Sequence, residues 1–108
     1  MKLFRVLFTT VIVLLILQAQ TPLRVLTLSI TKRCSGCQLR AVNLRNVNLA
    51  GADLSNADLR GATLDSVNLN NANLQGANLR DARLYNVTTK DTDFCGAILM
   101  DAVKGYCD

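Results

Sequence analysis

The chain has 108 residues, which is enough for one small domain and excludes a second. Lys and Arg number 12 against 8 acidic residues, and His and Trp are absent. Every acidic residue is Asp, and the lack of His removes the side chain that most often serves acid–base catalysis at neutral pH. With six Gly, one Pro, three Phe and two Tyr beside abundant Leu and Asn, the composition indicates a repetitive construction.

The first 19 residues have the layout of a secretory signal peptide. Lys2 and Arg5 precede an apolar stretch from Leu7 to Leu17, and Ala19 suits the last position before cleavage. The stretch is shorter than the roughly 20 residues of a membrane-spanning helix. The sequence therefore predicts an exported protein of a periplasm, a thylakoid lumen or the medium, with no stable membrane anchor after residues 1–19 are removed. Cleavage removes two basic residues and no acid, so the formal net charge falls from +4 to +2.

Residues 20–36 are expected to form an N-terminal cap. Thr21-Pro22 is a typical helix opening, and Leu23, Leu26 and Ile30 share one face at helical spacing. The same segment also alternates as a strand does, and we favour the helix. Either structure would cover apolar side chains at the N-terminal end of the domain.

From Cys37 onward, a large apolar residue recurs at every fifth position. A small or β-branched residue stands two positions before each centre. Five residues of an α-helix rotate the side chain by about 140°, so the centres would share no helical face. On a straight strand the odd spacing would send successive centres to opposite faces. The chain must therefore turn once per unit and close into a coil that buries the centres along its axis. The centres are Leu39, Leu44, Leu49, Leu54, Leu59, Leu64, Leu69, Leu74, Leu79, Leu84, Thr89, Phe94 and Leu99.

The units over residues 37–101 resemble those of the pentapeptide-repeat family. Ala52-Asp53-Leu54-Ser55-Asn56 and Ala72-Asn73-Leu74-Gln75-Gly76 carry the resemblance. It implies an all-β solenoid, a right-handed quadrilateral β-helix in which four units make one turn, with about three turns in this chain. The central residue and the small residue two before it then point inward.

Residues twenty apart are vertical neighbours in such a coil. Val47, Val67 and Val87 are expected to form one inner column. Thr89 places a hydroxyl where Leu is expected. A local bend is one interpretation, and we favour a tolerated substitution.

Four cysteines in an exported chain predict disulfides. In a coil of this kind, Cys37 and Cys95 lie about three turns apart, roughly 14 Å, whereas bridged Cα atoms lie within about 7 Å. This leaves Cys34 with Cys37 and Cys95 with Cys107, the second fixing the tail of residues 102–108 onto the last turn. Two other interpretations stay open: a redox-active dithiol at Cys34 and Cys37, and a zinc site.

The C-terminal tail is short, and the end of the coil needs a cover. Ile98, Met100, Val103 and Tyr106 are candidates for a cap or for a dimer contact. Proteins of the family that the chain resembles are known to form end-to-end dimers. We therefore predict a tendency to form a homodimer through the C-terminal end.

Outward residues twenty apart include Arg40, Arg60 and Arg80 on one face. Three stacked guanidinium groups can hold an anionic polymer or a carboxylated partner. The simpler interpretation is a solvated face on which nearby aspartates, such as Asp58 and Asp81, balance the arginines.

The sequence gives little support for catalytic activity, for cofactor binding or for a role that involves nucleic acids. Asp91 and Asp93 are expected to be exposed, and no catalytic, cofactor or metal residues are predicted. Residues 37–101 hold six basic residues and seven Asp, a net charge of −1, which is too weak for the topoisomerase inhibitors of the family that mimic DNA. The sequence predicts a non-enzymatic structural or protein-interaction module whose protein partner is unknown. The alternative is a thiol–disulfide redox or redox-sensing protein that uses Cys34 and Cys37.

Overall fold

The computed structural model describes residue 28 and residues 31–100 and 105–107. The predicted signal peptide lies outside these residues, as do most of the predicted cap and four of the seven residues of the tail. Leu28 and Thr31 are helical, and the Lys32 N–H donates to the Leu28 carbonyl at 2.9 Å, the i to i−4 bond of an α-helix. Among the described residues, no helix is long and apolar enough to cross a membrane.

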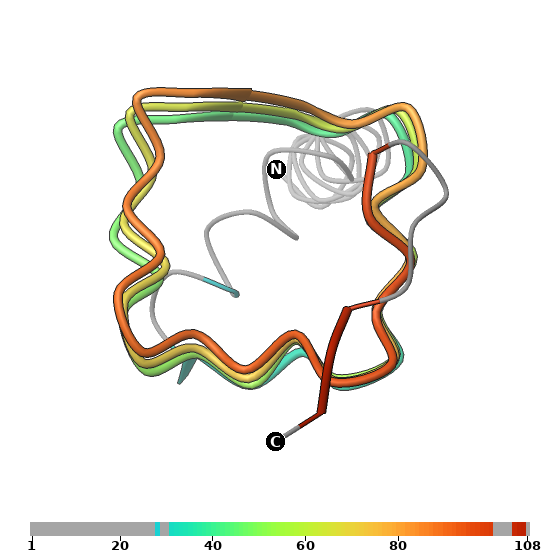
Figure 1. The fold of residues 1–108 in the computed structure, drawn as a ribbon. Helices are drawn as coiled ribbons and strands as arrows, with labels where there is room; N and C mark the ends of the chain where they lie inside the picture. Colours follow the sequence, from blue (N-terminus) through green and yellow to red (C-terminus); the bar gives the residue numbers. More distant parts are fainter. Residues whose placement is uncertain (1–27, 29–30, 101–104, 108) are drawn as a thin grey trace, which may run out of the picture.

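Successive coils of the chain pair with each other in a twenty-residue register. The strands β1 (Asn43–Arg45), β2 (Thr63–Asp65) and β3 (Arg83–Tyr85) form a parallel sheet in the order β1-β2-β3. Isolated bridges keep the same spacing on the other sides, from Arg33 with Asp53 to Asn78 with Ile98. Viewed along the axis, the coils superimpose as a four-sided frame (Figure 1). The chain is thus a solenoid of the β-helix type.

Each unit turns at a residue in the left-handed region of backbone conformation. This residue lies two positions after the centre, and its φ is +53° at Asn46 and +65° at Gly76. Gly, Asn and Asp enter this region at least cost, which explains why they are frequent in the chain. At most corners the N–H three residues after the centre donates back to the carbonyl of the centre, as from Ala62 to Leu59 at 3.0 Å. The described residues at this position are Ala41, Asn46, Gly51, Asn56, Gly61, Ser66, Asn71, Gly76, Asp81, Asn86, Asp91 and Gly96.

The position just before the centre fixes the turn that follows. The side-chain oxygen of an Asn or Asp at this position accepts a hydrogen bond from the backbone N–H two residues later. The Ser55 N–H donates to Asp53 Oδ1 at 3.1 Å, and the Gln75 N–H donates to Asn73 Oδ1 at 3.0 Å. Short polar side chains form such turns readily. The sequence shows these positions only as frequently Asn or Asp, whereas the structure gives them a part in shaping the coil.

The core is a single column of side chains along the axis. Leu49, Leu69 and Leu74 are completely buried, and alanines such as Ala52 fill the second inward position. Leu28 is 1% exposed and packs in the same core at the N-terminal end. Such close packing leaves no room on the axis for a larger residue at the alanine positions.

Two details of the predicted register can be checked. Residues next to the valine column pair as expected, Asn48 with Asn68 and Asn68 with Thr88, so Val47, Val67 and Val87 do stack. The register continues past Thr89, since Asn73 still pairs with Asp93. Thr89 is therefore a substitution that the coil tolerates and marks no bend. Its side chain is exposed because no described coil lies above it.

Candidate interaction site at the C-terminal mouth

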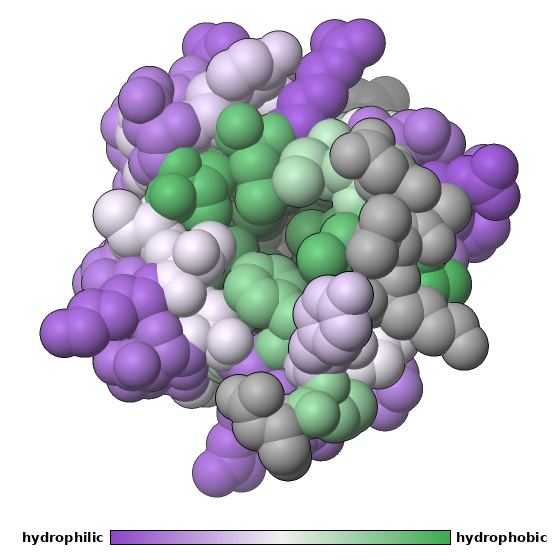
Figure 2. Space-filling model, in the orientation of Figure 1, coloured by the Kyte–Doolittle hydropathy of each residue, from purple (hydrophilic) through white to green (hydrophobic). Residues whose placement is uncertain are grey.

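The axis opens at the C-terminal end into an apolar hollow. We call this end the C-terminal mouth. The hollow has a volume of about 410 Å³. Figure 2 shows apolar side chains in the middle of this end and hydrophilic ones around its rim. Burial falls here because the last coil is not covered: Leu84, Phe94 and Leu99 are only partly buried. The hollow is lined by Leu79, Leu84, Asn86, Val87, Thr89, Phe94, Leu99 and Met100.

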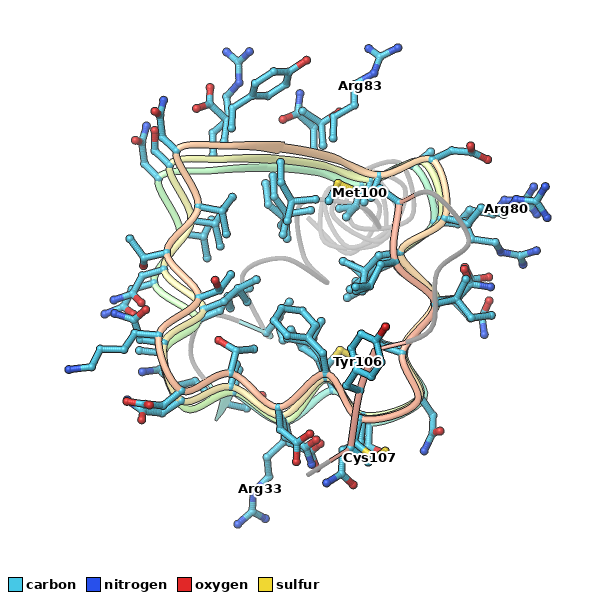
Figure 3. All side chains as sticks on the ribbon, viewed as in Figure 1. Arg33, Arg80, Arg83, Met100, Tyr106 and Cys107 are labelled. Carbon is cyan, nitrogen blue, oxygen red and sulfur yellow. A yellow bond between two sulfur atoms is a disulfide. The ribbon has the colours of Figure 1, made fainter. Side chains whose placement is uncertain are left out.

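A second hollow of about 650 Å³ adjoins the first, with Phe94 and Leu99 in the lining of both. Gly105, Tyr106 and Cys107, which we call the tail segment, line one side of it. Tyr106 is 90% exposed and Met100 44% exposed. In Figure 3 both lie over the end of the frame, whereas Arg80 and Arg83 point away from it. The mouth thus exposes apolar side chains to solvent.

The structure places the four residues predicted as contacts at this end in different positions. Met100 lines the smaller hollow and Tyr106 lines the larger one. Ile98 instead occupies a bridge position in the wall of the coil, paired with Asn78, because it directly precedes a centre. Val103 lies outside the described residues.

Gly105 holds the tail segment to the last coil and was missed in the sequence. Its N–H donates to the Ala97 carbonyl at 2.7 Å, and its carbonyl accepts the Gly96 N–H at 3.2 Å. A Cβ atom at this position would collide with the carbonyl group of Phe94, so only Gly fits. The available signal was a Gly two residues before the last Cys, but the contact with Phe94 appears only on folding.

The structure contains two disulfides, Cys34–Cys37 and Cys95–Cys107, with Cα separations of 5.2 and 4.5 Å. No described cysteine is free, and no group of three or more His, Cys, Asp or Glu among the described residues could hold a metal ion. Cys34 is 8% exposed within the core, whereas Cys107 is exposed at the surface. The pair proposed for redox chemistry from sequence is therefore the less accessible one.

Asp93 fixes the turn that carries Cys95. One of its carboxylate oxygens accepts the Cys95 N–H at 2.9 Å, and the other accepts an N–H of the Gln75 side chain at 2.6 Å. Both hydrogen bonds lower the pKa of Asp93, and the one from the Cys95 N–H has the larger effect. Asp93 is thus a structural residue of the mouth. Asp91 and Asp93 are both exposed, as expected from the sequence.

The arginine column follows the same register on one flank of the solenoid. The bridges of Gln38 with Asp58 and of Asp58 with Asn78 place Arg40, Arg60 and Arg80 above one another. All three have a carboxylate nearby, since Asp58 pairs with Arg60 and also attracts Arg40, which matches the simpler interpretation given from sequence. Arg80 lies 4.0 Å from Asp81 in an exposed pair, and such pairs contribute little. The C-terminal mouth, unlike this face, exposes a group of apolar side chains.

Arg60 and Asp58 form a two-pronged pair. Arg60 Nε and Nη2 donate to the two oxygens of Asp58 at 2.8 and 2.6 Å. These bonds, with one from the Arg60 backbone N–H, lower the pKa of Asp58 to about 2 although partial burial opposes the shift. The same pairing raises the pKa of Arg60.

This pair makes stability depend on pH in the acid range. Because the pKa of Asp58 is lowered from 3.8 to about 2 on folding, its contribution is complete above pH 3.8 and is lost as the pH falls towards 2. We expect about 1 kcal/mol, since solvent screens Arg60, whose side chain is 42% exposed. Unfolding free energies measured at intervals from about pH 5 to about pH 2 check this. Asp58→Asn should flatten the curve, and an unchanged curve would contradict the assignment.

The comparisons with known proteins agree with this architecture. Residues 33–71 and 64–101 match the family model of pentapeptide repeats. The chain belongs to the pentapeptide-repeat family. Proteins of this family are generally structural or interaction modules and not enzymes.

Solved structures of pentapeptide-repeat proteins are similar to this chain. One is a thylakoid lumen protein of Arabidopsis thaliana, with 36% identity, a TM-score of 0.61, and coverage of 66% of this chain and 50% of that chain. HetL of the cyanobacterium Nostoc, involved in heterocyst differentiation regulation, has 28% identity, a TM-score of 0.27 and coverage of 68% and 51%. A protein of the cyanobacterium Cyanothece has 32% identity, a TM-score of 0.28 and coverage of 56% and 48%. The chain spans about half the length of these three proteins. None of the curated proteins matches it.

Proposed function

We propose that this pentapeptide-repeat protein is an exported, non-enzymatic interaction module that pairs with a second copy through the C-terminal mouth. The observation that carries the proposal is the contrast between the two ends of the core. Leu28 is buried at the N-terminal end, whereas Phe94, Leu99 and Leu84 at the C-terminal end are only partly covered.

A second copy suits this end because large apolar side chains are exposed there. Of the three exposed large apolar residues among those described, Met100 and Tyr106 lie at the mouth and only Tyr85 lies on a flank. Two mouths that face each other would bury apolar surface against apolar surface, which is the main driving force of association.

Export and the finer geometry form part of the same proposal. Two disulfides, which persist in oxidising compartments, support export, and so does the similarity to a thylakoid lumen protein. We infer a right-handed coil of about three turns from membership of the family. The test of export is the N-terminus of the protein isolated from its own host. A start near Gln20 is expected, and a start at Met1 would overturn export.

Pairing through the mouth is tested by comparing two substitutions of exposed residues, one at the mouth and one on the flank of the solenoid. We expect Met100→Asp to abolish the dimer, because it places a charge in the apolar contact. Tyr85→Asp is the matched control, since Tyr85 is 55% exposed and lies on β3, away from the hollow. Sedimentation velocity over a range of concentrations measures the dimer fraction of the three proteins. Monomers at every concentration, or equal loss in both variants, would reject pairing through the mouth.

A further inference from the structure

The Cys95–Cys107 disulfide attaches the tail segment to the C-terminal mouth. Apart from this bond, Gly105 supplies the described backbone contacts of the segment, one to Ala97 and one to Gly96. Comparable bonds join the coils below, such as those from Gly76 to Cys95 at 2.9 Å and from Ile98 to Ala77 at 2.8 Å. The tail segment therefore takes the place of the next coil along one side of the mouth. Two hydrogen bonds alone are a weak attachment, so the disulfide decides whether the segment stays.

The two disulfides of the chain differ in accessibility. Cys107 is exposed and Cys95 half-buried, whereas Cys34 is 8% exposed and Cys37 packs against the core. Exchange requires a thiolate to reach one of the two sulfur atoms. A reductant in solution therefore has access to Cys107 first.

The disulfide also borders the apolar surface of the mouth. Cys95 and Cys107 line the larger hollow, together with Phe94 and Leu99, which also line the smaller one. Removing the tail segment would join the two hollows across Phe94 and Leu99. The oxidation state of one bond thus sets how much apolar surface this end offers.

We propose that the Cys95–Cys107 disulfide is a site of thiol–disulfide exchange with a dithiol reductant, and that its reduction releases the tail segment and opens the C-terminal mouth. A thiolate of the reductant attacks Cys107 Sγ, and Cys95 leaves as a thiolate. The second thiol of the reductant then displaces Cys107 by closing the disulfide of the reductant. Two electrons pass from the reductant to the cystine, and the two new thiolates take up the two protons that the dithiol releases. That the opened mouth then pairs more readily rests on the proposed function.

The first experiment tests the exchange itself on the full chain. Brief treatment of the native protein with dithiothreitol, followed by alkylation and peptide mass mapping, should label Cys95 and Cys107 about tenfold faster than Cys34 and Cys37. Equal rates, or faster reduction of the N-terminal pair, would overturn the proposal.

The second experiment tests release by hydrogen exchange at two amides. The Gly96 N–H donates to Gly105, whereas the Gly76 N–H donates to Cys95 within the coil. Selective reduction should remove the protection of the Gly96 amide and leave that of the Gly76 amide unchanged. Persistent protection of Gly96 would show that the segment stays in place, which overturns the release.

Variants separate this inference from the proposed function. Cys95→Ser/Cys107→Ser mimics the reduced state, and Cys34→Ser/Cys37→Ser is the matched control. Gly105→Ala disturbs the two hydrogen bonds of the segment by its collision with Phe94 but keeps the Cys95–Cys107 bond. It therefore tests whether the disulfide or the hydrogen bonds of Gly105 keep the mouth closed. Sedimentation of each variant, with and without reductant, measures pairing.

Each outcome of the sedimentation has a distinct meaning. Pairing that becomes about tenfold tighter in the reduced protein and in Cys95→Ser/Cys107→Ser, but not in Gly105→Ala, supports both proposals. Equal pairing in all states removes the control by the disulfide and leaves pairing through the mouth intact. Pairing that weakens on reduction shows that the segment belongs to the contact, which overturns the opening. Monomers in every state reject the proposed function, while the exchange of the Gly96 amide still decides the release.

Discussion

Leu59→Ala is expected to lower the free energy of unfolding by about 3 to 5 kcal/mol, as for other fully buried leucines. Leu59 is 1% exposed and stands between Leu39 and Leu79 in the twenty-residue register, both of which are buried. The coils above and below are held apart by their backbone pairing, so they cannot close the cavity that Ala leaves. Chemical denaturation followed by circular dichroism measures the loss.

Leu99→Ala is the matched control for this substitution. Leu99 occupies the same position of a unit at the open mouth, where it is only half-buried. Less apolar surface is lost there, and no closed cavity forms, so we expect less than half the effect of Leu59→Ala. Equal losses at the two sites would contradict the burial gradient along the axis.

Ala72→Leu is expected to destabilise the solenoid by about 1 to 3 kcal/mol although it adds apolar surface. Ala72 is 1% exposed, and the register places Ala52 below it and Thr92 above it. The Thr92 hydroxyl donates to the Leu69 carbonyl at 2.7 Å, so Thr92 cannot move aside without losing this bond. The axis is already filled by leucines, and the added atoms must push the coils apart.

The control for Ala72→Leu introduces the same residue at an outward position. Arg40 is exposed, so Arg40→Leu should change the free energy of unfolding by no more than about 0.5 kcal/mol. Thermal and chemical unfolding of the two variants check the pair. A stabilised Ala72→Leu protein would mean that the axis has room, against the tight packing of the alanine positions.

The solenoid was predictable because its information is local and repeated. Each unit, such as those centred on Leu54 and Leu74, turns the chain in the same way and places its centre inside. Four such units make one coil, so the repetition of the unit fixes the twenty-residue stacking. The valine column and the tolerance of Thr89 followed from the same register. The turn-forming role of residues such as Asp53 did not follow, because an outward Asp reads as an ordinary solvent-facing residue until its hydrogen bond to the turn is seen.

The site was predictable only in part. Met100 and Tyr106 were assigned to the C-terminal end by their chain position, and their place at the mouth agrees with this. Ile98 was assigned there too, but the phase of the repeat puts it in the wall of the coil. The redox interpretation was placed on Cys34 and Cys37 by their close spacing in sequence, whereas accessibility, a property of the folded chain, directs attention to Cys107.

The sequence by itself determined that this protein coils every five residues around an axis of leucines and small residues, because each unit satisfies that geometry with its own residues. Only the tertiary structure decided which contacts cover the N-terminal end of the solenoid and which leave the C-terminal end open. Leu28 meets the core at one end, and Gly105 fits against Phe94 at the other, through contacts between segments that no local pattern relates. Interactions between repeats recur and can be read from a pattern, whereas contacts at the two ends occur once and depend on how much of the last coil remains uncovered.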